Sequence, residues 1–228
     1  MGRNAFTKNV PEHTFATLNK ESSYTRLAIS PGVINKHYTP AQLQKIAEIV
    51  GEDGAIKYSA SYYLLISIPT EKRLEIQQQL EDAGLYIAKH GAVVDMKACD
   101  FCDGEKMEAA AIMEALYKTF IGQAVPNRLR MNVNGCASAC YNAMYDDIGL
   151  VYQQESFDVY VGAIPMGRHA QAGKLFAKNI SVENIEAFLQ AMLHIYNEFA
   201  RENEPFHRFF KRTKVEAFWA NLLVSHID

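Results

Sequence analysis

The sequence predicts an α+β protein in which helices cover one face of a sheet. First, between residues 26 and 95, segments rich in β-branched and aromatic residues alternate with segments whose apolar residues recur at helical spacing. Second, residues 105–223 contain a further mixture of strand and helix patterns. Third, the four cysteines fall into two close pairs, at 99/102 and 136/140, both after this first stretch of the chain. These observations favour two structural parts, with the special chemistry in the second.

The first part has clear start and stop signals for its helices. Thr39-Pro40 is typical of a helix N-cap followed by proline at the first helical position, where no N–H is needed. Gly51 and Gly84 are typical of helix ends. In chain order we expect a strand over 26–29, a helix from Thr39-Pro40 to Gly51, a strand over 56–68, a helix from Thr70 to Gly84, and a strand or strand pair over 86–95.

The second part follows the same logic. Residues 105–120 carry apolar side chains at helical spacing, so we expect an amphipathic helix that begins just after Cys102. The exposed amides at its start would favour a nearby anionic group. The remaining expected elements are strands over 128–133 and 157–164, a helix from Ser181 or Val182 to about Arg201, and one or two helices over 205–223.

Length and composition bound the class of protein. A chain of 228 residues accommodates one large domain or two small ones, and we divide it into a polar N-terminal arm (1–25), a first half (26–92) and a second half (93–228). Apolar residues make up 49% and charged residues 21%, with a net charge of −3, so nothing indicates a nucleic-acid partner. No apolar run approaches the roughly 18 residues that a membrane span needs, so we expect no membrane partner.

The cysteines indicate an inorganic centre. Cys136 and Cys140 lie in the stretch NGCASAC, and Cys99 and Cys102 lie in ACDFCDG. Four thiols are the number that a [4Fe–4S] cluster needs. A structural zinc site uses the same residue type and spacing, and two disulfides or buried unliganded cysteines are further alternatives. Because the N-terminus has no charged start followed by an apolar core, we expect the cytoplasm, a reducing compartment in which disulfides do not persist.

These stretches resemble a known family. NGCASAC followed by DDIGLVY is similar to the iron–sulfur and sirohaem half-domain of sulfite and nitrite reductases, whose ligand loop runs N-G-C-x3-C before D-I-G-L-V. Residues 32–85 are similar to the ferredoxin-like half of the same family. The resemblance implies a ferredoxin-like α/β sandwich half followed by a sirohaem and [4Fe–4S] half, with both groups as cofactors.

The resemblance also implies a set of ligands. Cys99, Cys102, Cys136 and Cys140 would hold the cluster, and Cys140 would also bridge to the sirohaem iron. The first pair departs from the family, because it is C-x2-C where the family usually has C-x5-C. Alignment on the helix after Cys102 puts Met96 at the family's first cysteine position, so Cys99 would supply that sulfur from a shifted backbone.

Cationic residues at matching places have implied roles in binding anions. Arg128 and Arg130 match a Lys-x-Lys pair, and Lys57 matches a strand arginine, so these three are the implied catalytic residues around a small inorganic anion. A second arginine of the family is replaced by Ser61. The candidates for contacts with the cofactor are, besides Cys140, the residues Arg26, Lys97, Arg168 and His169.

The sequence therefore predicts an oxidoreductase that reduces a small oxyanion, sulfite to sulfide in preference to nitrite to ammonia, with electrons passing from the cluster to sirohaem. The alternative is a non-catalytic relative that keeps the cluster fold for electron transfer, for sirohaem handling or as a subunit of a larger complex. Without a nucleotide-binding motif, electrons would come from a ferredoxin or a reductase subunit. A single copy of the two halves predicts a homo-oligomer or pairing with a homologous subunit, through C-terminal helices rich in aromatic residues, over 206–219.

Overall fold

The structure, a computed structural model, describes the whole chain except residues 1–22, 35, 53, 60–62, 166 and 227–228, and the side chain of His226. It confirms the α+β class and divides into two compact units, Met1–Ala88 and Lys89–Asp228, here called the N-terminal and C-terminal units. Nearly all of the arm predicted over residues 1–25 lies outside the described residues. None of the described helices is long and apolar enough to cross a membrane.

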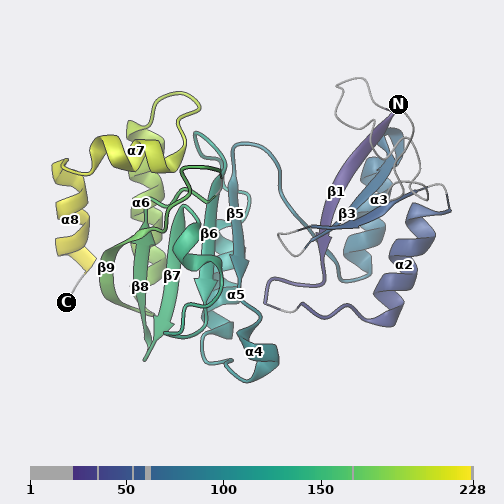
Figure 1. Cartoon of the computed structure of the whole chain (residues 1–228), viewed down its shortest axis with the longest axis horizontal. Helices are drawn as coiled ribbons and strands as arrows, with labels where there is room; N and C mark the ends of the chain where they lie inside the picture. Colours follow the sequence, from purple (N-terminus) through teal and green to yellow (C-terminus); the bar gives the residue numbers. More distant parts are fainter. Residues whose placement is uncertain (1–22, 35, 53, 60–62, 166, 227–228) are drawn as a thin grey trace. The chain divides into compact units, whose positions relative to one another are not determined.

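The N-terminal unit is a four-stranded antiparallel sheet with the strand order β2-β3-β1-β4. This order and the sequence of elements are those of the ferredoxin-like split β-α-β arrangement. Figure 1 shows α2 and α3 together beside the sheet. The elements are β1 (Tyr24–Ser30), α2 (Pro40–Val50), β2 (Ile56–Tyr58), β3 (Leu64–Pro69), η1 (Thr70–Lys72), α3 (Arg73–Asp82) and β4 (Tyr86–Ile87).

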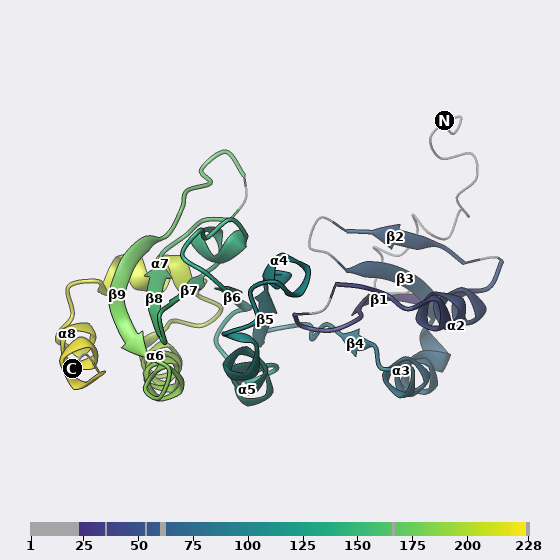
Figure 2. The ribbon, with the colours of Figure 1, turned by 90° about the horizontal axis from the view of Figure 1, so that it is seen from below.

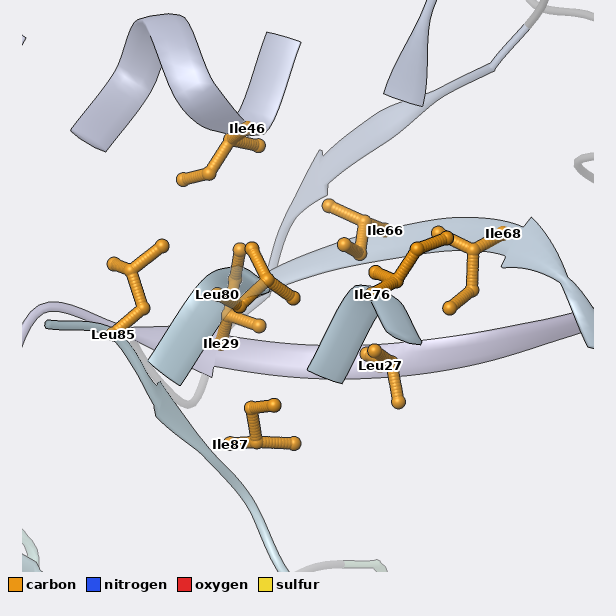
Figure 3. Close-up of a cluster of buried hydrophobic side chains, with 9 residues drawn as sticks. All are labelled: Leu27, Ile29, Ile46, Ile66, Ile68, Ile76, Leu80, Leu85 and Ile87. Atoms are coloured by element: carbon orange, nitrogen blue, oxygen red, sulfur yellow. The ribbon is translucent and has the colours of Figure 1, made fainter. Parts of the chain in front are cut away.

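An aliphatic core joins this sheet to its helices. Leu27 of β1 is the register partner of Ile66 of β3, so alternate residues of both strands share one face. That face packs against α2 and α3, as Figure 3 shows. The buried side chains are Leu27, Ile29, Ile46, Ile66, Ile68, Ile76, Leu80, Leu85 and Ile87.

Thr39 fixes the start of α2 as the sequence predicts. Its hydroxyl accepts a hydrogen bond from the Gln42 amide at 3.2 Å, and the Gln42 side chain accepts one from the Thr39 amide at 3.0 Å. The Gln42 side-chain nitrogen also donates to the carbonyl oxygens of Ala83 and Gly84, each at 3.3 Å. One residue therefore caps α2 and ties it to the end of α3.

The C-terminal unit is a mixed five-stranded sheet with the order β5-β6-β7-β8-β9. β5, β6 and β7 are parallel neighbours, whereas β8 and β9 are antiparallel. Figures 1 and 2 place α5 and α6 on one face of this sheet and the short η2 turn on the other. The elements are β5 (Val94–Ala98), α4 (Phe101–Gly104), α5 (Ala110–Phe120), β6 (Leu129–Asn134), η2 (Asn142–Tyr145), β7 (Ile148–Gln153), β8 (Ser156–Val161), β9 (Lys174–Ser181), α6 (Ile185–Phe199), α7 (Phe206–Thr213) and α8 (Ala217–His226).

The aromatic residues of α7 and α8 pack within their own unit. Phe206, Phe209 and Trp219 are buried, and Phe176 of β9 lies edge-to-face against Trp219 at a centroid distance of 5.4 Å. These helices therefore cap the core of the C-terminal unit. The expectation that the same aromatic side chains form a surface for self-association is wrong for Phe206, Phe209 and Trp219, because the core already buries them.

Two predicted elements differ from the structure, and two strands are not predicted. The long strand expected over 56–68 is instead two antiparallel strands, β2 and β3, joined through a segment that is partly outside the described residues. The helix expected from residue 105 begins at Ala110. β7 and β9 were not predicted as strands, because glycine, aspartate and lysine interrupt the apolar pattern in and around them.

Candidate functional site

Both cysteine pairs follow the carboxyl ends of neighbouring parallel strands. Cys99 comes directly after β5, and Cys136 comes two residues after the end of β6. The Cys99 amide donates to the carbonyl oxygen of Val133 at 2.9 Å, which extends the pairing of the two strands. The Gly135 amide then donates to the Cys99 sulfur at 3.2 Å. The sheet therefore brings the start of both cysteine segments to one edge, here called the cysteine edge.

Gly135 is the residue that permits this close approach. A Cβ atom at position 135 would lie 2.7 Å from the ring of Phe101, which is itself 1% exposed. The family alignment puts Met96 at the first cysteine position. Met96 is buried within β5, on the sheet face that also bears Val94 and Ala98. Cys99 is therefore the sulfur that the chain places at this position.

Cys102 lies on an unusual turn. Phe101, Cys102 and Asp103 all have φ of 53°, so the element labelled α4 is a left-handed turn made of consecutive non-glycine residues. The Asp100 carboxylate accepts a hydrogen bond from the Cys102 amide at 3.2 Å and helps to hold the turn. Cys102 is exposed, whereas Cys99 is 8% exposed.

The η2 turn anchors the chain after Cys140, which is also exposed. The side-chain oxygen of Asn134, at the end of β6, accepts a hydrogen bond from the Ala143 amide at 3.2 Å. A Cβ atom at Gly149 would lie 1.8 Å from the Ala143 carbonyl oxygen, so η2 rests directly on β7. The glycine in the DDIGLVY stretch is thus required by the segment that carries Cys140.

Electrostatic interactions link the thiols across the two segments. Burial raises the pKa of the Cys99 thiol, while hydrogen bonds from the amides of Gly135 and Phe101 oppose that rise. Desolvation, followed by the charges of Cys136 and Cys140, raises the pKa of Cys102. In the described residues, no three His, Cys, Asp or Glu side chains converge closely enough to hold a single metal ion. The electrostatic interactions therefore show that thiols of the two segments are neighbours.

The sheet face beneath η2 carries the predicted cationic residues. Asp95 is the register partner of Arg130, and its side chain pairs with Arg128 at 2.6 Å. Asp95 is 1% exposed and the Arg128 side chain is 35% exposed, so Arg128 is committed to a buried carboxylate. Lys97 lies on the same face, two residues after Asp95. We call Asp95, Lys97, Arg128, Arg130, Asn132, Asp146 and Asp147 the polar face.

Acidic residues of the polar face offset its cations. Burial lowers the pKa of Lys97, and the charges of Asp95 and Asp146 oppose that shift. Burial raises the pKa of Asp146, which accepts a hydrogen bond from the Asn132 side chain at 2.9 Å. Burial also raises the pKa of Asp147 to about 6, although this carboxylate accepts a hydrogen bond from the Arg130 amide at 2.9 Å. The three cations thus lie among three carboxylates.

Several buried atoms of the polar face have no hydrogen-bond partner within the part of the chain that the structure describes. They are Asp95 Oδ1, Arg128 Nε and Asn132 Oδ1. Arg128 therefore meets Asp95 through one nitrogen and one oxygen, without the second parallel bond of a bidentate pair. Buried water is the ordinary way in which such atoms are satisfied.

The other predicted cofactor contacts lie elsewhere. Arg168 and His169 are exposed in the loop after β8, and Arg168 Nε donates to His169 Nε2 at 3.1 Å. Because β8 runs antiparallel to β7 and ends at Val161, opposite Ile148, this loop leaves the sheet at the end away from the cysteine edge. Its final residue, Gly173, returns to donate to the Met144 carbonyl oxygen at 2.7 Å.

Two further candidates belong to the N-terminal unit. Arg26 is the register partner of Ser67, and Lys57 is the register partner of Leu65. Ser67 and Leu65 are two residues apart on β3, so Arg26 and Lys57 share the sheet face opposite the aliphatic core. Ser61, which replaces a second family arginine, lies outside the described residues.

With this geometry established, comparisons with known proteins identify the family. Residues 92–226 match the family described as the nitrite and sulphite reductase 4Fe-4S domain. The chain belongs to this family. Membership supports an iron–sulfur protein of an oxidoreductase family, and the matched region includes all four cysteines.

Individual relatives bear names of different kinds. A cobalt-factor III methyltransferase of Priestia megaterium is 39% identical over 89% of this chain and 38% of its own length. A nitrite reductase [NAD(P)H] of Bacillus subtilis is 26% identical over 89% of this chain and 25% of its own length. An assimilatory-type sulfite reductase of Nitratidesulfovibrio vulgaris is 21% identical over 48% of this chain and 50% of its own length. The chain thus spans half or less of the length of these relatives.

Solved structures of the family share the fold. The Mycobacterium tuberculosis NirA protein aligns with a TM-score of 0.68 at 13% identity, over 90% of this chain and 40% of that protein. Dissimilatory sulfite reductase I aligns with a TM-score of 0.69 at 12% identity, over 87% of this chain and 68% of that protein. Both likenesses confirm the predicted α+β fold class, of the sulfite reductase type.

Sequence reasoning missed the residues that support the cysteines and neutralise the arginines. Asp95 precedes Cys99 by four residues and lies in an alternating polar and apolar segment, so its place on the face opposite Met96 was readable from the strand period. Its pairing with Arg128 was not readable, because 33 residues separate them. Asn132, Asp146 and Asp147 had no motif of their own.

Proposed function

We propose that this chain is a redox protein of the sulfite and nitrite reductase family that binds one [4Fe–4S] cluster and passes single electrons through it. Cys99, Cys102, Cys136 and Cys140 are its ligands. The observation that carries the proposal is the placement of two cysteine segments at the carboxyl ends of the adjacent parallel strands β5 and β6, joined by the hydrogen bond from the Gly135 amide to the Cys99 sulfur. Hydrogen bonds to sulfur and partial exclusion of water are the means by which proteins set cluster potentials.

Membership of a family described by its 4Fe-4S domain favours a cluster over zinc. In a tetrahedral zinc site all four sulfurs lie about 2.3 Å from one ion, so they must converge tightly. In a [4Fe–4S] cluster each cysteine binds a different iron, so the sulfurs surround a larger group. Cys140 affects the pKa of Cys99, and Cys136 and Cys140 affect that of Cys102, so the four thiols of the matched region lie near one another.

The polar face supports electron transfer in preference to reduction of an oxyanion by the chain itself. Binding sulfite or nitrite needs a site with excess positive charge. Here Asp95 pairs with Arg128, and Asp146 lies close enough to Lys97 to affect its pKa. One relative, 39% identical, is named a cobalt-factor III methyltransferase. Similarity to this chain therefore extends to a protein whose name does not refer to oxyanion reduction.

Sirohaem fits the C-terminal unit poorly. Its eight carboxylates call for several uncompensated cations and amides around an apolar pocket. Arg128 already has a carboxylate partner, and Arg168 and His169 leave the sheet at the end away from the cysteine edge. This arrangement therefore favours a cluster protein without sirohaem.

The second candidate function is a sirohaem-dependent sulfite or nitrite reductase, sulfite being preferred. It is favoured by the placement of Lys97, Arg128 and Arg130 on one face close to the cysteine edge. The names of several relatives also favour it. In this case Arg26 and Lys57 of the N-terminal unit would supply further cations to the substrate or the cofactor.

One experiment separates the two candidates. Protein purified without oxygen is assayed for iron, acid-labile sulfide and its ultraviolet–visible spectrum, and then for oxidation of reduced methyl viologen by sulfite and nitrite. The electron-transfer proposal expects about four irons and four sulfides per chain, a broad brown absorption and no oxyanion-dependent turnover. A Soret band together with sulfite- or nitrite-dependent turnover would replace it with the second candidate.

Variants of the cysteine loop provide the matched control. Cys136→Ser is expected to abolish cluster binding, whereas Ser138→Ala, in the same loop, is expected to retain the iron content of the natural sequence. Equal iron content in both variants would contradict the assignment of the ligands. The proposal further includes a separate electron donor, a ferredoxin or a reductase subunit, and a cytoplasmic location, where the thiols stay reduced.

A further inference from the structure

The four proposed cluster ligands are held with unequal firmness. Cys99 is buried, its amide donates to Val133 and its sulfur accepts a hydrogen bond from Gly135. Cys136 is half-buried and directly follows Gly135, which is packed against Phe101. The paired strands β5 and β6 therefore hold both residues in place.

Cys140 is exposed but firmly anchored downstream. Three residues later, the Ala143 amide bonds to the buried Asn134 side chain at 3.2 Å. The η2 turn then rests on Gly149 so closely that no Cβ atom fits between them. Moving Cys140 would therefore disturb a turn that is docked on the sheet.

Cys102 is supported on one side only, by Phe101, which precedes it and is buried against Gly135. It is exposed and occupies the middle of three consecutive non-glycine residues with φ of 53°. Such residues prefer right-handed or extended conformations, so the turn is a strained one. The following residues 103–108 are exposed, and α5 begins only at Ala110. The hydrogen bonds of the Cys102 backbone are local: its amide donates to Asp100 at 3.2 Å, and its carbonyl oxygen accepts from the Glu105 amide at 3.1 Å.

We propose that Cys102 holds the exchangeable corner of the cluster. The iron bound to Cys102 is the one that leaves on oxidation, and a small thiol from solvent can take the place of the Cys102 side chain. This inference rests on the proposed function. It adds a ligand-exchange site, whose chemical class of ligand is a small thiolate, at one of the four irons.

Oxidation of the cluster by one electron would release the iron bound to Cys102. The [4Fe–4S]²⁺ cluster gives one electron to an oxidant such as ferricyanide and becomes [4Fe–4S]³⁺. The iron at Cys102 then leaves as Fe²⁺, which leaves [3Fe–4S]⁺ on Cys99, Cys136 and Cys140. The bond between this iron and the Cys102 sulfur breaks together with the bonds from the iron to three sulfides, and the freed thiolate takes a proton from water. Ferrous iron and a reductant reverse the change.

Single alanine variants of the full-length chain test ligand exchange. Under anaerobic reconstitution, Cys102→Ala is expected to retain about three irons per chain, and 2-mercaptoethanol is expected to restore about four. Cys99→Ala is the matched control, because its site is buried and a small thiol cannot reach it, so we expect neither retention nor rescue. Loss of all iron from Cys102→Ala would overturn the inference. Equal retention by Cys140→Ala would also overturn it, because exposure of the cysteine alone would then determine which iron is exchangeable.

A second test keeps all four cysteines. Ferricyanide oxidation of the natural sequence is expected to release one Fe²⁺ per chain and to produce the electron paramagnetic resonance signal of a three-iron cluster. Asp103→Gly relaxes the left-handed turn, since glycine adopts positive φ without strain, and is expected to slow the release roughly threefold. Asp103→Val is expected to accelerate it, because a β-branched residue resists positive φ.

The two proposals fail separately. A reconstituted natural sequence that binds no iron would remove the proposed function and this inference together. A natural sequence with about four irons that keeps them all on oxidation, or whose release rate does not respond to either substitution at position 103, would remove only this inference.

Discussion

Two glycines determine how closely the chain can pack around the cysteines. Gly135 faces the ring of Phe101, and Gly149 faces the carbonyl oxygen of Ala143. Neither has positive φ in the structure, so the requirement is for space and not for backbone freedom. The glycines in NGC and in DIG therefore have a steric explanation. Each lets a second segment lie against the sheet at the place where a thiol must be positioned.

Gly149→Ala tests the contact beneath η2. The added Cβ atom would lie 1.8 Å from a backbone oxygen, so η2 must move away from β7. We expect a loss of about 3 kcal/mol in the free energy of unfolding, at the upper end of the usual cost of overpacking, together with reduced iron content. Urea denaturation and iron assays measure both effects. Gly173→Ala is the control, because its nearest contact is a milder 3.2 Å, and equal losses in both variants would contradict the explanation.

Asp147 is expected to make stability depend on pH. Burial raises its pKa from 3.8 to about 6, so the folded state binds the proton more tightly than the unfolded chain does. Stability from this group is therefore present at low pH and is lost as pH rises through about 6. The shift corresponds to about 3 kcal/mol between pH 3 and pH 7.

Asp147→Asn removes this titration while keeping an oxygen that accepts the hydrogen bond from the Arg130 amide. Its stability relative to the natural sequence is therefore expected to increase from pH 4 to pH 7, as measured by urea midpoints. Glu183→Gln, on the surface, removes the same charge and serves as the control. An equal pH-dependent gain in both variants would indicate a general charge effect in place of burial.

The pair formed by Asp95 and Arg128 is expected to show measurable coupling. Because Asp95 is 1% exposed and Arg128 is 35% exposed, solvent screens the pair only in part. A double-mutant cycle with Asp95→Asn and Arg128→Met is expected to give a coupling free energy of about 1–2 kcal/mol, between the values of surface and buried pairs. A coupling of zero by urea denaturation would mean that the arginine is available to bind anions.

At this scale the sequence predicted the thiols but not their surroundings. The pairing of cysteines is visible in the chain because each pair is local, and the alternation of β5 and β6 places Arg128 and Arg130 on one face. The neutralising partner of Arg128 is invisible, because it depends on the register of two strands whose contacting residues are 33 positions apart. Charged residues on a predicted strand therefore indicate a polar face, but they do not show whether acidic residues from other segments neutralise that face.

Secondary-structure elements were predictable where local chemistry decides them. The start of α2 at Thr39-Pro40 is such a case, since the capping box needs only residues three apart. The start of α5 is the opposite case. Residues 105–109 have helical periodicity, yet the left-handed turn at Phe101–Gly104 and the reverse turn after it delay the helix to Ala110. The position of Cys102 near the sheet edge, set by tertiary structure, overrides the local preference.

The α2 cap offers a direct test of a local element. Thr39→Ala removes the oxygen that accepts from the Gln42 amide, and we expect a loss of about 1 kcal/mol in the stability of the N-terminal unit. Thr39→Ser keeps the hydroxyl and is expected to retain most of that stability. Urea denaturation of the full chain, followed by far-ultraviolet circular dichroism, compares the two variants. Equal losses would mean that the threonine methyl group, and not the cap, is responsible.

For the whole molecule, the predicted site residues fall in both units, most of them in the C-terminal unit. All four cysteines and the polar face belong to the C-terminal unit, whereas Arg26 and Lys57 belong to the N-terminal unit. Self-association or pairing with a homologous subunit stays a prediction, to be measured by gel filtration with light scattering. Since Phe206, Phe209 and Trp219 are buried within one chain, any such interface must use other residues.

The division also predicts where cluster binding resides. The strands, turns and hydrogen bonds that position the thiols all lie within residues 89–228, and this unit has its own core of sheet, α5 and α6. A fragment of residues 89–228 is therefore expected to fold and to bind about four irons after anaerobic reconstitution, whereas residues 1–88 bind none. The absorption spectrum and iron content of both fragments are compared with those of the full chain. If residues 89–228 fold, as judged by circular dichroism, but bind no iron, the prediction that cluster binding resides in this unit is wrong.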